Sequence, residues 1–304
     1  MDRLEAMRTF LRVAEVGSFS AVAQQLGVAR SVVTRQVAAL EAHLGAKLMA
    51  RSTRRLSLTS AGTAYLEKCR VILNLVEAAE TDVAAERAVA RGKLRIGLPL
   101  IFGLKRLAPL LLDFTELHPG VNLDMDYTDR RVDLIEEGFD LSIRVTGRLG
   151  EADVVRRLGE SRIRTVASPG YLARHGRPAH PSDLAGHECL GYTADANPGT
   201  WPYTIDGRTE NVYVQYRMST NNGDVLAEAA VRGHGITLQP DFIADPWLAD
   251  GRLVEILEDF APAPLGVYAL LPGTRHLPYR VRVLIDYLAE RLAGDGGDVR
   301  PIRP

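Results

Sequence analysis

Hydrophobic positions near the start of the chain recur at the spacing of a helix. In "VARSVVTRQVAALEAHLG", residues 28–45, the apolar side chains follow one another at steps of four, three and four: Val33, Val37, Leu40 and Leu44. That spacing predicts an amphipathic helix with one buried stripe. The opposite face carries short side chains and one arginine: Ser31, Thr34, Arg35, Ala38 and Ala42. A face this slim predicts close approach by a large partner.

Two shorter helices and a ribbon surround this stretch. The first helix is marked by Leu4, Met7, Leu11 and Ala14. Gly17 ends it, and Ser20 is expected to cap the next helix, "AVAQQL", which Gly27 closes. Helices joined by a tight turn with glycine predict a helix-turn-helix. The following "KLMARSTRRLSLT" alternates polar and β-prone residues around a basic tip, which predicts a two-stranded wing.

A long helix is predicted from Thr59 onward. Its apolar residues are spaced 4, 3, 4, 3 and 4 apart: Tyr65, Cys69, Ile72, Val76, Ala79 and Val83. Such a heptad seam is typical of paired helices. A helix of roughly 30 residues is about 45 Å long, more than a small domain needs for its own core. We therefore expect a linker helix that pairs two chains, with a helix packed on the following domain as the alternative.

Beyond Gly92, strand and helix patterns alternate. The first set is "KLRIGLPL", "LKRLAPLLLDFTELHP", "VNLDMDY", the short helix "RVDLIEEG" and the strand "DLSIRV". The second set is "RTVASPGYL", "VYVQYRMST", "NNGDVLAEAAVRG" and "ITLQP", and "GVYALLP" and "RVRVLIDYLAERL" add one more strand and helix. Alternation of this kind predicts mostly parallel α/β sheets. The tail, residues 294–304, has little apolar surface to bury and is expected to be disordered.

Charge is distributed unevenly along the chain. The 304 residues have a net charge of −1, but residues 1–62 contain nine Lys and Arg against four Asp and Glu. A basic segment on a neutral protein indicates a nucleic-acid module joined to something else. We expect base and phosphate contacts at Ser20, Arg30, Ser31, Thr34, Arg35, Arg51, Arg54 and Arg55. A solvated helix beside a basic loop is the simpler alternative.

Residues 1–66 resemble the DNA-binding domain of LysR-type transcriptional regulators. The resemblance is carried by "GSFSAVAQQLGV", "RQVAALEAHLG" and "LSLTSAG". The runs "YTDRRVDLIEEGFDLSIRV", "ASPGYL", "GHGITLQP" and "VRVLIDYL" resemble the effector-binding portion of the same family. Ala29, Arg30 and Thr34 depart from the Ser or Thr cap, the Gln and the Ser that are common in the family. The missing cap costs about 1 kcal/mol unless Ser31 caps a shorter helix.

The resemblance implies a multidomain α/β protein. Its parts are a winged helix-turn-helix over 1–59, a linker helix over 60–91 and an effector-binding portion over 92–293. The last part is expected to be a pair of Rossmann-like subdomains, as in periplasmic binding proteins. The first subdomain takes residues 92–162 and 268–293, and the second takes residues 163–267.

A small organic effector is expected in the cleft between these subdomains, where strands end. The resemblance assigns it to Leu100, Ile101, Phe102, Thr128, Arg144, Thr146, Thr200, Trp201, Asn221 and Pro240. The apolar run at 100–102 favours a partly apolar ligand. Ordinary packing is the alternative for each residue, with Asn221 as a helix cap and Trp201 as cover for a core edge.

Motifs for catalysis are absent from the sequence. It contains no G-x-S-x-G, no P-loop and no complete zincin motif, and Cys69 and Cys189 are far apart. We therefore expect no enzyme activity, no metal and no cofactor. With no apolar stretch long enough for a membrane, a cytoplasmic protein is expected.

The resemblance further implies double-stranded DNA and RNA polymerase as partners, a dimer through the linker helix, and a tetramer. A cytoplasmic small-molecule binding protein or enzyme whose basic N-terminal region only dimerises is the alternative.

Overall fold

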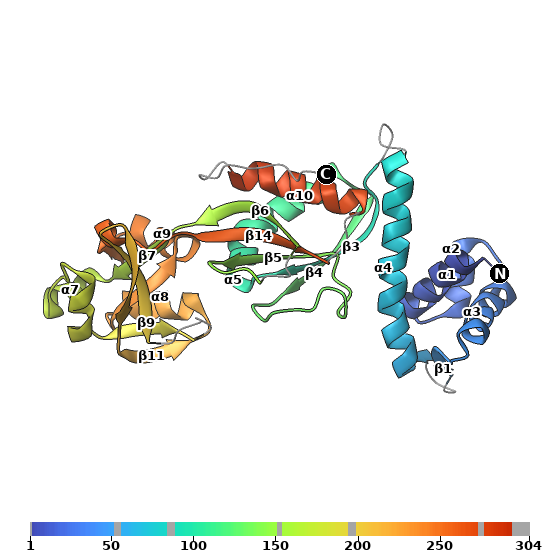
Figure 1. Ribbon diagram of the computed structural model, residues 1–304, viewed down its shortest axis with the longest axis horizontal. Coiled ribbons are helices and arrows are strands. Elements are labelled where there is room, and N and C mark those ends of the chain that lie inside the picture. Colours follow the sequence, from blue (N-terminus) through green and yellow to red (C-terminus); the bar gives the residue numbers. More distant parts are fainter. Residues whose placement is uncertain are drawn as a thin grey trace.

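The computed structural model describes residues 2–51, 56–83, 89–150, 154–193, 199–272 and 277–293. Three bodies lie in a row (Figure 1): the N-terminal helices at one end, a first α/β subdomain in the middle and a second at the other end. The long helix α4 stands between the N-terminal helices and the first subdomain. No helix of the described part has both the length and the apolar character to cross a membrane.

The N-terminal domain is the expected winged helix-turn-helix. Its elements are α1 (Arg3–Val16), α2 (Phe19–Leu26), α3 (Arg30–Leu44), β1 (Met49–Arg51) and β2 (Leu56–Leu58). Gly17, Gly27 and Gly45 end the three helices in the left-handed conformation, which glycine adopts without strain. The two strands pair antiparallel, with Met49 opposite Leu58.

The cap of α2 differs from the expected one. Ser18 is the N-cap, and its Oγ accepts a hydrogen bond from the amide of Ala21 at 3.3 Å. Ser20 is exposed in the first turn, so the expectation that it caps the helix is wrong. The helix begins earlier because Phe19, which packs against the domain core, is already part of it.

Helix α4 (Ser60–Val83) completes the core of the N-terminal domain. Leu66 and Cys69 are buried with Phe10 of α1, and Tyr65 packs beside them. The expected pairing seam is therefore wrong at Tyr65 and Cys69, because these side chains serve their own domain. The side chains of Ala79 and Val83 lie outside the described residues. The core of this domain thus extends past residue 59.

The first subdomain is built on a mixed sheet. Its strand order is β4-β3-β5-β14-β6, with β3 (Gly92–Leu98), β4 (Val121–Tyr127), β5 (Leu141–Thr146), β6 (Val154–Ser161) and β14 (Leu265–Leu271). Strand β3 runs parallel to β4 and β5, whereas β14 runs antiparallel to β5 and β6. The helices are α5 (Leu100–Phe102), a π-helix (Gly103–Leu107), α6 (Ala108–Leu117) and α10 (Tyr279–Leu292).

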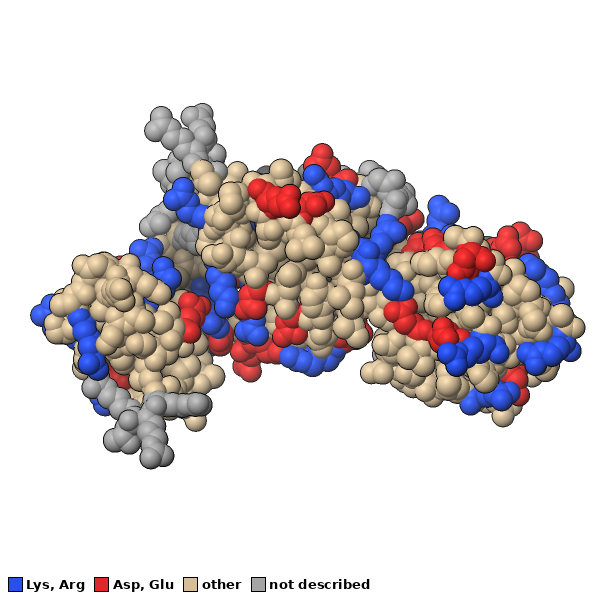
Figure 2. All heavy atoms as spheres, turned by 180° about the vertical axis from the view of Figure 1, so that it is seen from behind, with Lys and Arg blue, Asp and Glu red and all other residues tan. Residues whose placement is uncertain are grey.

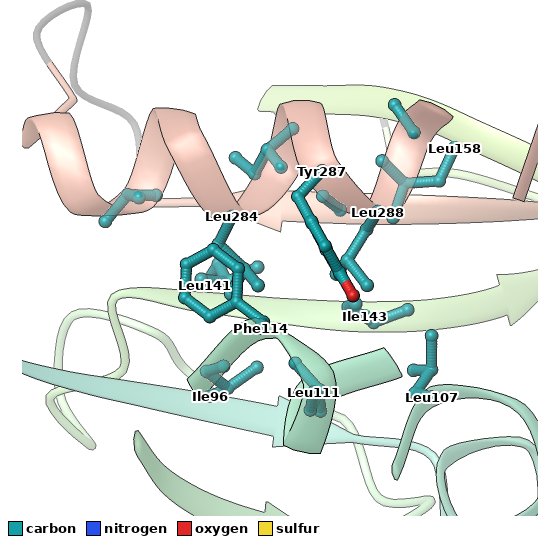
Figure 3. Close-up of a cluster of buried hydrophobic side chains, with 14 of the residues drawn as sticks. Ile96, Leu107, Leu111, Phe114, Leu141, Ile143, Leu158, Leu284, Tyr287 and Leu288 are labelled. Atoms are coloured by element: carbon teal, nitrogen blue, oxygen red, sulfur yellow. The ribbon is translucent and has the colours of Figure 1, made fainter. Parts of the chain in front are cut away.

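Helices α6 and α10 meet over the core of this subdomain. Figure 3 shows side chains of α10 reaching toward the sheet, with Leu284 and Leu288 near Leu141 and Ile143. Phe114 of α6 and Tyr287 of α10 pack edge to face, with ring centroids 5.2 Å apart. This core fixes the strands whose ends carry several expected effector residues.

The second subdomain repeats the mixed arrangement. Its strand order is β11-β8-β12-β7-β13, with β7 (Ile163–Ala167), β8 (Cys189–Tyr192), β11 (Tyr216–Thr220), β12 (Ile236–Pro240) and β13 (Val254–Ile256). A separate antiparallel pair is formed by β9 (Thr200–Ile205) and β10 (Arg208–Tyr213). The helices are α7 (Pro169–His175), α8 (Gly223–Val231) and α9 (Asp241–Ala249), with 3₁₀ turns at Pro181–Gly186 and Glu258–Phe260.

The chain crosses between the subdomains twice, as expected. The first crossing lies between β6 and β7, and the second lies between β13 and β14. Because β14 already begins at Leu265, the second crossing comes before the expected boundary at 268. The expectation of mostly parallel sheets is wrong, because each crossing brings in antiparallel neighbours.

Two further elements expected from the sequence are different in the structure. Residues 131–138 form a loop with turns instead of a helix, and within it the side chain of Asp133 accepts from the amides of Ile135 and Glu136. The run "VYVQYRMST" is divided between β10 and β11. The tail 294–304 lies outside the described residues.

Candidate functional site

The slim face of α3 points away from the protein. Val33, Val37 and Leu40 are buried, while Leu44 is exposed beyond the core. On the other face the side chains of Arg30, Ser31, Arg35, Ala38 and Ala42 are exposed, and that of Thr34 is half-buried. The amphipathic helix predicted here is confirmed except at Leu44, and its donors share one surface.

The start of α3 has no capping side chain. The helix begins at Arg30 with Ala29 as its N-cap, which makes no side-chain hydrogen bond. Ser31 therefore does not cap a shorter helix. The first amides of an uncapped helix keep their N–H groups available to an anion such as a phosphate.

Two polar contacts hold α3 in place. The Thr9 hydroxyl of α1 donates to Gln36 Oε1 at 2.8 Å, with Thr9 fully buried. At the other end Glu41, also buried, accepts from the amides of Leu48 and Met49 at 3.0 and 3.2 Å. Lys47 Nζ donates to the same carboxylate at 2.7 Å. Glu41 thus ties α3 to the first strand of the wing.

The ionisation of Glu41 follows from these contacts. Burial alone raises the pKa of the carboxyl, but the hydrogen bonds from Lys47, Met49 and Leu48 outweigh it and leave the pKa below its ordinary value. Sequence reasoning did not identify this role. The available signal is that Glu41 is the only acidic residue between positions 30 and 55.

The wing carries basic residues whose side chains are not described. Arg51 ends β1, and its side chain lies outside the described residues, as do Arg54 and Arg55 altogether. In Figure 2 blue side chains stand along the outer edge of the N-terminal domain, at the left of that view. A basic outer edge suits a polyanionic partner.

Several expected effector residues meet at the loop after β4. The amide of Leu100 donates to Asp129 Oδ1 at 3.0 Å, and the amide of Thr128 donates to the Leu98 carbonyl at 2.8 Å. The guanidinium of Arg144 donates to the carbonyls of Asp129 and Arg130. The structure therefore gathers Leu100, Thr128 and Arg144 around one loop.

Thr146, Phe102 and Trp201 do not join the group of expected effector residues at this loop. Thr146 lies further along β5 and hydrogen-bonds Arg148. Phe102 is buried and packs edge to face on Phe242 of α9, with centroids 5.1 Å apart. Trp201, next to Thr200 in the separate pair β9–β10, is buried in the core of the second subdomain. Phe102 and Trp201 have packing roles, as the alternative for these residues predicts, and their part in an effector site stays a prediction.

The start of α8 faces the first subdomain. Asn222, not Asn221, is the N-cap of α8, and its Oδ1 accepts from the amide of Val225 at 3.2 Å. Asn221 is exposed beside it. A side chain at Gly223 would meet Gln239, Ile243 and Ile101, so Ile101 reaches across from the first subdomain. Pro240 ends β12 next to Gln239 and is the N-cap of α9.

An ion pair joins the two subdomains at the same place. Lys105 Nζ of the π-helix lies 2.6 Å from Asp224 Oδ1 of α8. This pair and the approach of Ile101 to α8 hold the two sides together. A ligand entering here would have to compete with both contacts.

The two thiols are poorly suited to act as nucleophiles or metal ligands. Cys69 and Cys189 are free and buried, and burial raises the pKa of Cys69 to about 11 and that of Cys189 to about 12. A thiol that stays protonated is a weak nucleophile and a weak metal ligand. Among the described residues no cluster of three or more His, Cys, Asp or Glu side chains is arranged to hold a metal ion.

The chain matches two family models. Residues 4–63 match "Bacterial regulatory helix-turn-helix protein, lysR family", and residues 87–293 match "LysR substrate binding domain". The transcriptional regulator CrgA of Neisseria meningitidis serogroup C is 35% identical over 96% of this chain and 97% of its own length. YhjC of Escherichia coli K12, named as a transcriptional regulator, is 34% identical over 95% of this chain and 97% of its own.

Solved structures show the same architecture. The structure of CrgA, a LysR-type transcriptional regulator, matches with a TM-score of 0.60 and 34% identity, covering 95% of this chain and 98% of that one. A full-length OxyR variant from Pseudomonas aeruginosa matches with a TM-score of 0.65 over 95% of this chain and 94% of its own. At 14% identity, that second likeness concerns the fold alone.

Proposed function

This chain belongs to the LysR family of transcriptional regulators, and from that premise we propose that its α3 helix reads a specific DNA site under the control of a small organic molecule. The observation that carries the proposal is the exposed face of α3, where hydroxyl and guanidinium donors stand among alanines. The major groove of DNA admits a helix, and a slim outer face brings the helix close to the bases.

Each basic and hydroxyl residue has a role in this proposal. Thr34 and Arg35 lie in the middle of the face and would reach base edges. The starts of α2 and α3 and the wing would contact phosphates or flanking bases, through Ser20, Arg30, Ser31, Arg51, Arg54 and Arg55. Two copies would place their α3 helices about 34 Å apart, or a multiple of that distance, on a partly palindromic site.

A face of α4 that shares only Ile72 with the expected seam supports pairing of two chains. Ala61, Ala64, Lys68 and Ile72 are exposed and follow one another at steps of three, four and four. Those steps place them along one side of the helix, and the two alanines allow a second helix to approach closely. The proposed dimer therefore uses α4, but not through Tyr65 and Cys69.

Exposed apolar side chains support a further contact between the α/β portions. In the first subdomain Leu104 and Leu112 are 56% and 60% exposed, and Met125 on the edge strand β4 is exposed as well. In the second subdomain Met218 of the edge strand β11 and Val225 of α8 are also exposed. Side chains of this kind can be covered when two chains associate. Pairing of dimers through them would give a tetramer.

The effector site is proposed at the loop after β4, bounded by Leu100, Ile101, Thr128 and Arg144. A partly apolar ligand fits this set, which combines two aliphatic side chains with a hydroxyl and a guanidinium. A ligand that binds one arrangement of the subdomains better shifts the population by its differential affinity only. RNA polymerase is the proposed second partner, the cytoplasm is the proposed location, and neither enzyme activity nor a cofactor is part of the proposal.

Electrophoretic mobility shift with the gene's own upstream DNA tests the function. The full-length chain should form a complex there that survives an excess of unrelated DNA, and its affinity should fall steeply with salt as counterions are released. No specific complex at any salt concentration would favour a small-molecule binding protein or enzyme whose N-terminal region only dimerises.

A further inference from the structure

A polar cluster joins α4 to the first α/β subdomain. Asn74 of α4 donates from Nδ2 to Asp140 Oδ1 at 2.9 Å, and its Oδ1 accepts from Arg280 Nη2 of α10 at 2.8 Å. Arg280 Nη2 also lies 3.7 Å from Asp140 Oδ1. One amide side chain thus uses its donor and its acceptor to bridge a carboxylate and a guanidinium. We call Asn74, Asp140 and Arg280 the linker joint.

The linker joint is buried and fixed to the sheet. The side chains of Arg280 and Asp140 are only 7% and 11% exposed. Asp140 Oδ2 accepts from the amide of Arg95 at 2.8 Å, and Arg280 Nε donates to the carbonyl of Lys93 at 2.9 Å. Because Lys93 and Arg95 belong to β3, which has strands on both sides, Asn74 is tied to the rigid part of the subdomain.

A second contact lies two turns earlier on α4. Gly138 has a φ of +68°, and a Cβ built there would overlap Glu67 Oε2 of α4. This Oε2 is buried with no hydrogen-bond partner among the described residues, while Oε1 accepts from Arg70 Nη1 at 2.6 Å. Glu67 and Asn74 are seven residues apart, about 10 Å along the axis, and therefore lie on one side of the helix.

This second contact continues into the N-terminal domain. Arg70 lies 3.6 Å from Glu15 of α1, so a residue that adjoins the α/β subdomain also contacts the helix that packs on α3. Figure 1 shows α4 standing between these two bodies. Two contacts about two turns apart constrain both the position and the tilt of a helix, whereas one contact leaves the tilt free.

Strand β5 connects the linker joint with the proposed effector site. Asp140 directly precedes β5, and Arg144 lies on that strand about 13 Å further on. Beside the linker joint is a cavity of about 720 Å³ whose wall includes Asn74, Asp140 and Arg280, together with residues of α1. This space permits α4 and α1 to tilt when the linker joint is broken.

We propose that the linker joint positions the DNA-reading domain by holding α4 at one orientation on the first α/β subdomain. Asn74, Asp140 and Arg280 are positioning residues, and position 138 takes a glycine both for its left-handed backbone and for the space that Glu67 fills. The orientation itself is a property of the free protein, and only its consequence for DNA rests on the proposed function.

Distances between spin labels in the free protein test the orientation. Labels at Gln24→Cys in α2 and Glu116→Cys in α6, both exposed sites, span the two bodies. The native thiols are buried with raised pKa values and should stay unlabelled. Labelled protein diluted into unlabelled protein reports distances within one chain. The labelled chain with an intact linker joint should give a narrow component at the distance between these two sites in the structure, and Asn74→Leu should lose it.

Exchanging the side chains at positions 74 and 140 tests whether the narrow distance distribution can be restored. Asn74→Asp brings two carboxylates together, and Asp140→Asn leaves either Asn74 or Arg280 without its partner. In the double variant, the carboxylate at position 74 accepts from Arg280 and from the amide at position 140, whose oxygen still accepts from the Arg95 amide. Each single variant should broaden the distribution, and the double variant should restore it. An unchanged distribution in Asn74→Leu would overturn the proposal.

The glycine contact has a matched control. Gly138→Ala and Gly251→Ala carry the same backbone strain, since their φ values are +68° and +73°, but only position 138 has a neighbour in the way. The first variant should broaden the label distances, and the second should leave them unchanged. Equal effects of the two would mean that strain, and not the contact with Glu67, is responsible.

Binding to one and to two half-sites separates this proposal from the proposed function. Asn74→Leu should keep the affinity for a single half-site and lose about fivefold or more of the preference for the native spacing of two half-sites. Retention of the full spacing preference would contradict the proposal. A wild-type chain that binds no DNA would contradict the proposed function instead, while the label distances would still decide the role of the linker joint.

Discussion

Arginines are used differently at the two ends of the molecule. In the N-terminal domain Arg30 and Arg35 are exposed, and neither has an ion-pair partner among the described residues. In the second α/β subdomain Arg164 of β7 binds Asp245 of α9 at 2.7 Å and Glu255 of β13 at 2.6 Å. Arginine side chains therefore face solvent in the N-terminal domain, and in the second α/β subdomain an arginine joins a strand to a helix and to a second strand.

The difference shows where an external anion is expected. An arginine already paired with carboxylates gains little from a phosphate. An unpaired exposed arginine, in contrast, neutralises a phosphate and so displaces counterions from the DNA. The net charge of −1 hides this division, because the acidic residues that balance the chain lie mainly beyond residue 62. The position of each arginine relative to the carboxylates, more than the total charge of the chain, indicates the surface that binds an anion.

The largest effect is expected at Glu41, the buried carboxylate of the basic domain. Glu41→Ala should lower the free energy of unfolding of the N-terminal domain by about 3 kcal/mol, because the amides of Leu48 and Met49 lose a charged acceptor. Glu41→Gln keeps one acceptor and should lose less. Urea denaturation measures both, and equal stability of all three proteins would show that the wing is not anchored here.

The same residue gives a pH dependence with a defined sign. The pKa of Glu41 is lowered in the folded state, so its stabilisation is present above the unfolded value, close to 4.5, and is lost as pH falls through the folded value. The stability of Glu41→Gln should fall less between neutral pH and acid than that of the wild type. Parallel stability curves would exclude this contribution.

The next largest effect is expected for Arg35→Ala. Loss of a base contact should reduce discrimination between the operator and altered sites by about 1–3 kcal/mol. Arg12→Ala is the matched control, since Arg12 is exposed on α1 and lines the cavity toward the α/β portion. Competition binding with altered operators should separate the two variants. The same loss of discrimination in both would assign it to net charge instead of a reading contact.

A smaller effect, on stability instead of DNA binding, is expected for Arg164→Ala. Its side chain is 25% exposed and joins two carboxylates, so its removal should cost about 1 kcal/mol of stability and leave DNA binding unchanged. Arg208→Ala, at an exposed position of β10, should change neither quantity. Thermal unfolding and the band shift together test the contrast, which a DNA-binding defect in Arg164→Ala would break.

The smallest effect is expected for Arg54→Ala in the basic tip of the wing, which lies outside the described residues. Loss of one phosphate contact should weaken all DNA sequences about equally and reduce the slope of log affinity against log salt by about 1. Titrations at several salt concentrations measure this slope. A change confined to one operator sequence would instead assign Arg54 to base reading.

Residues close together in the sequence account for most of the successful predictions. Helix α3 is predicted from Val33, Val37 and Leu40 because a helix brings every third or fourth residue to one face. The cap of α2 is missed by only two residues, since Ser18 and Ser20 have the same capping chemistry. Which of the two serines caps the helix depends on where the side chain of Phe19 packs against the core.

The positions of the expected effector residues were predicted less well, because these residues meet only after folding. Leu100, Thr128 and Arg144 do gather around one loop, as expected from strands that end at one edge. Phe102 and Trp201, by contrast, lie outside the elements expected from the sequence, and their side chains are buried in cores. A pattern that places a residue at a strand end does not decide toward which side its side chain turns.

The sequence by itself determined the winged helix-turn-helix and the alternating strands and helices that follow, because caps, glycine turns and hydrophobic periods act between neighbours. Only the tertiary structure decided which side of α4 is buried, since Tyr65 and Cys69 suit a partner helix as well as their own domain. It alone also brought Asn74 to Arg280, 206 positions away. Contacts at such separation depend on how whole elements pack, and no local spacing records them.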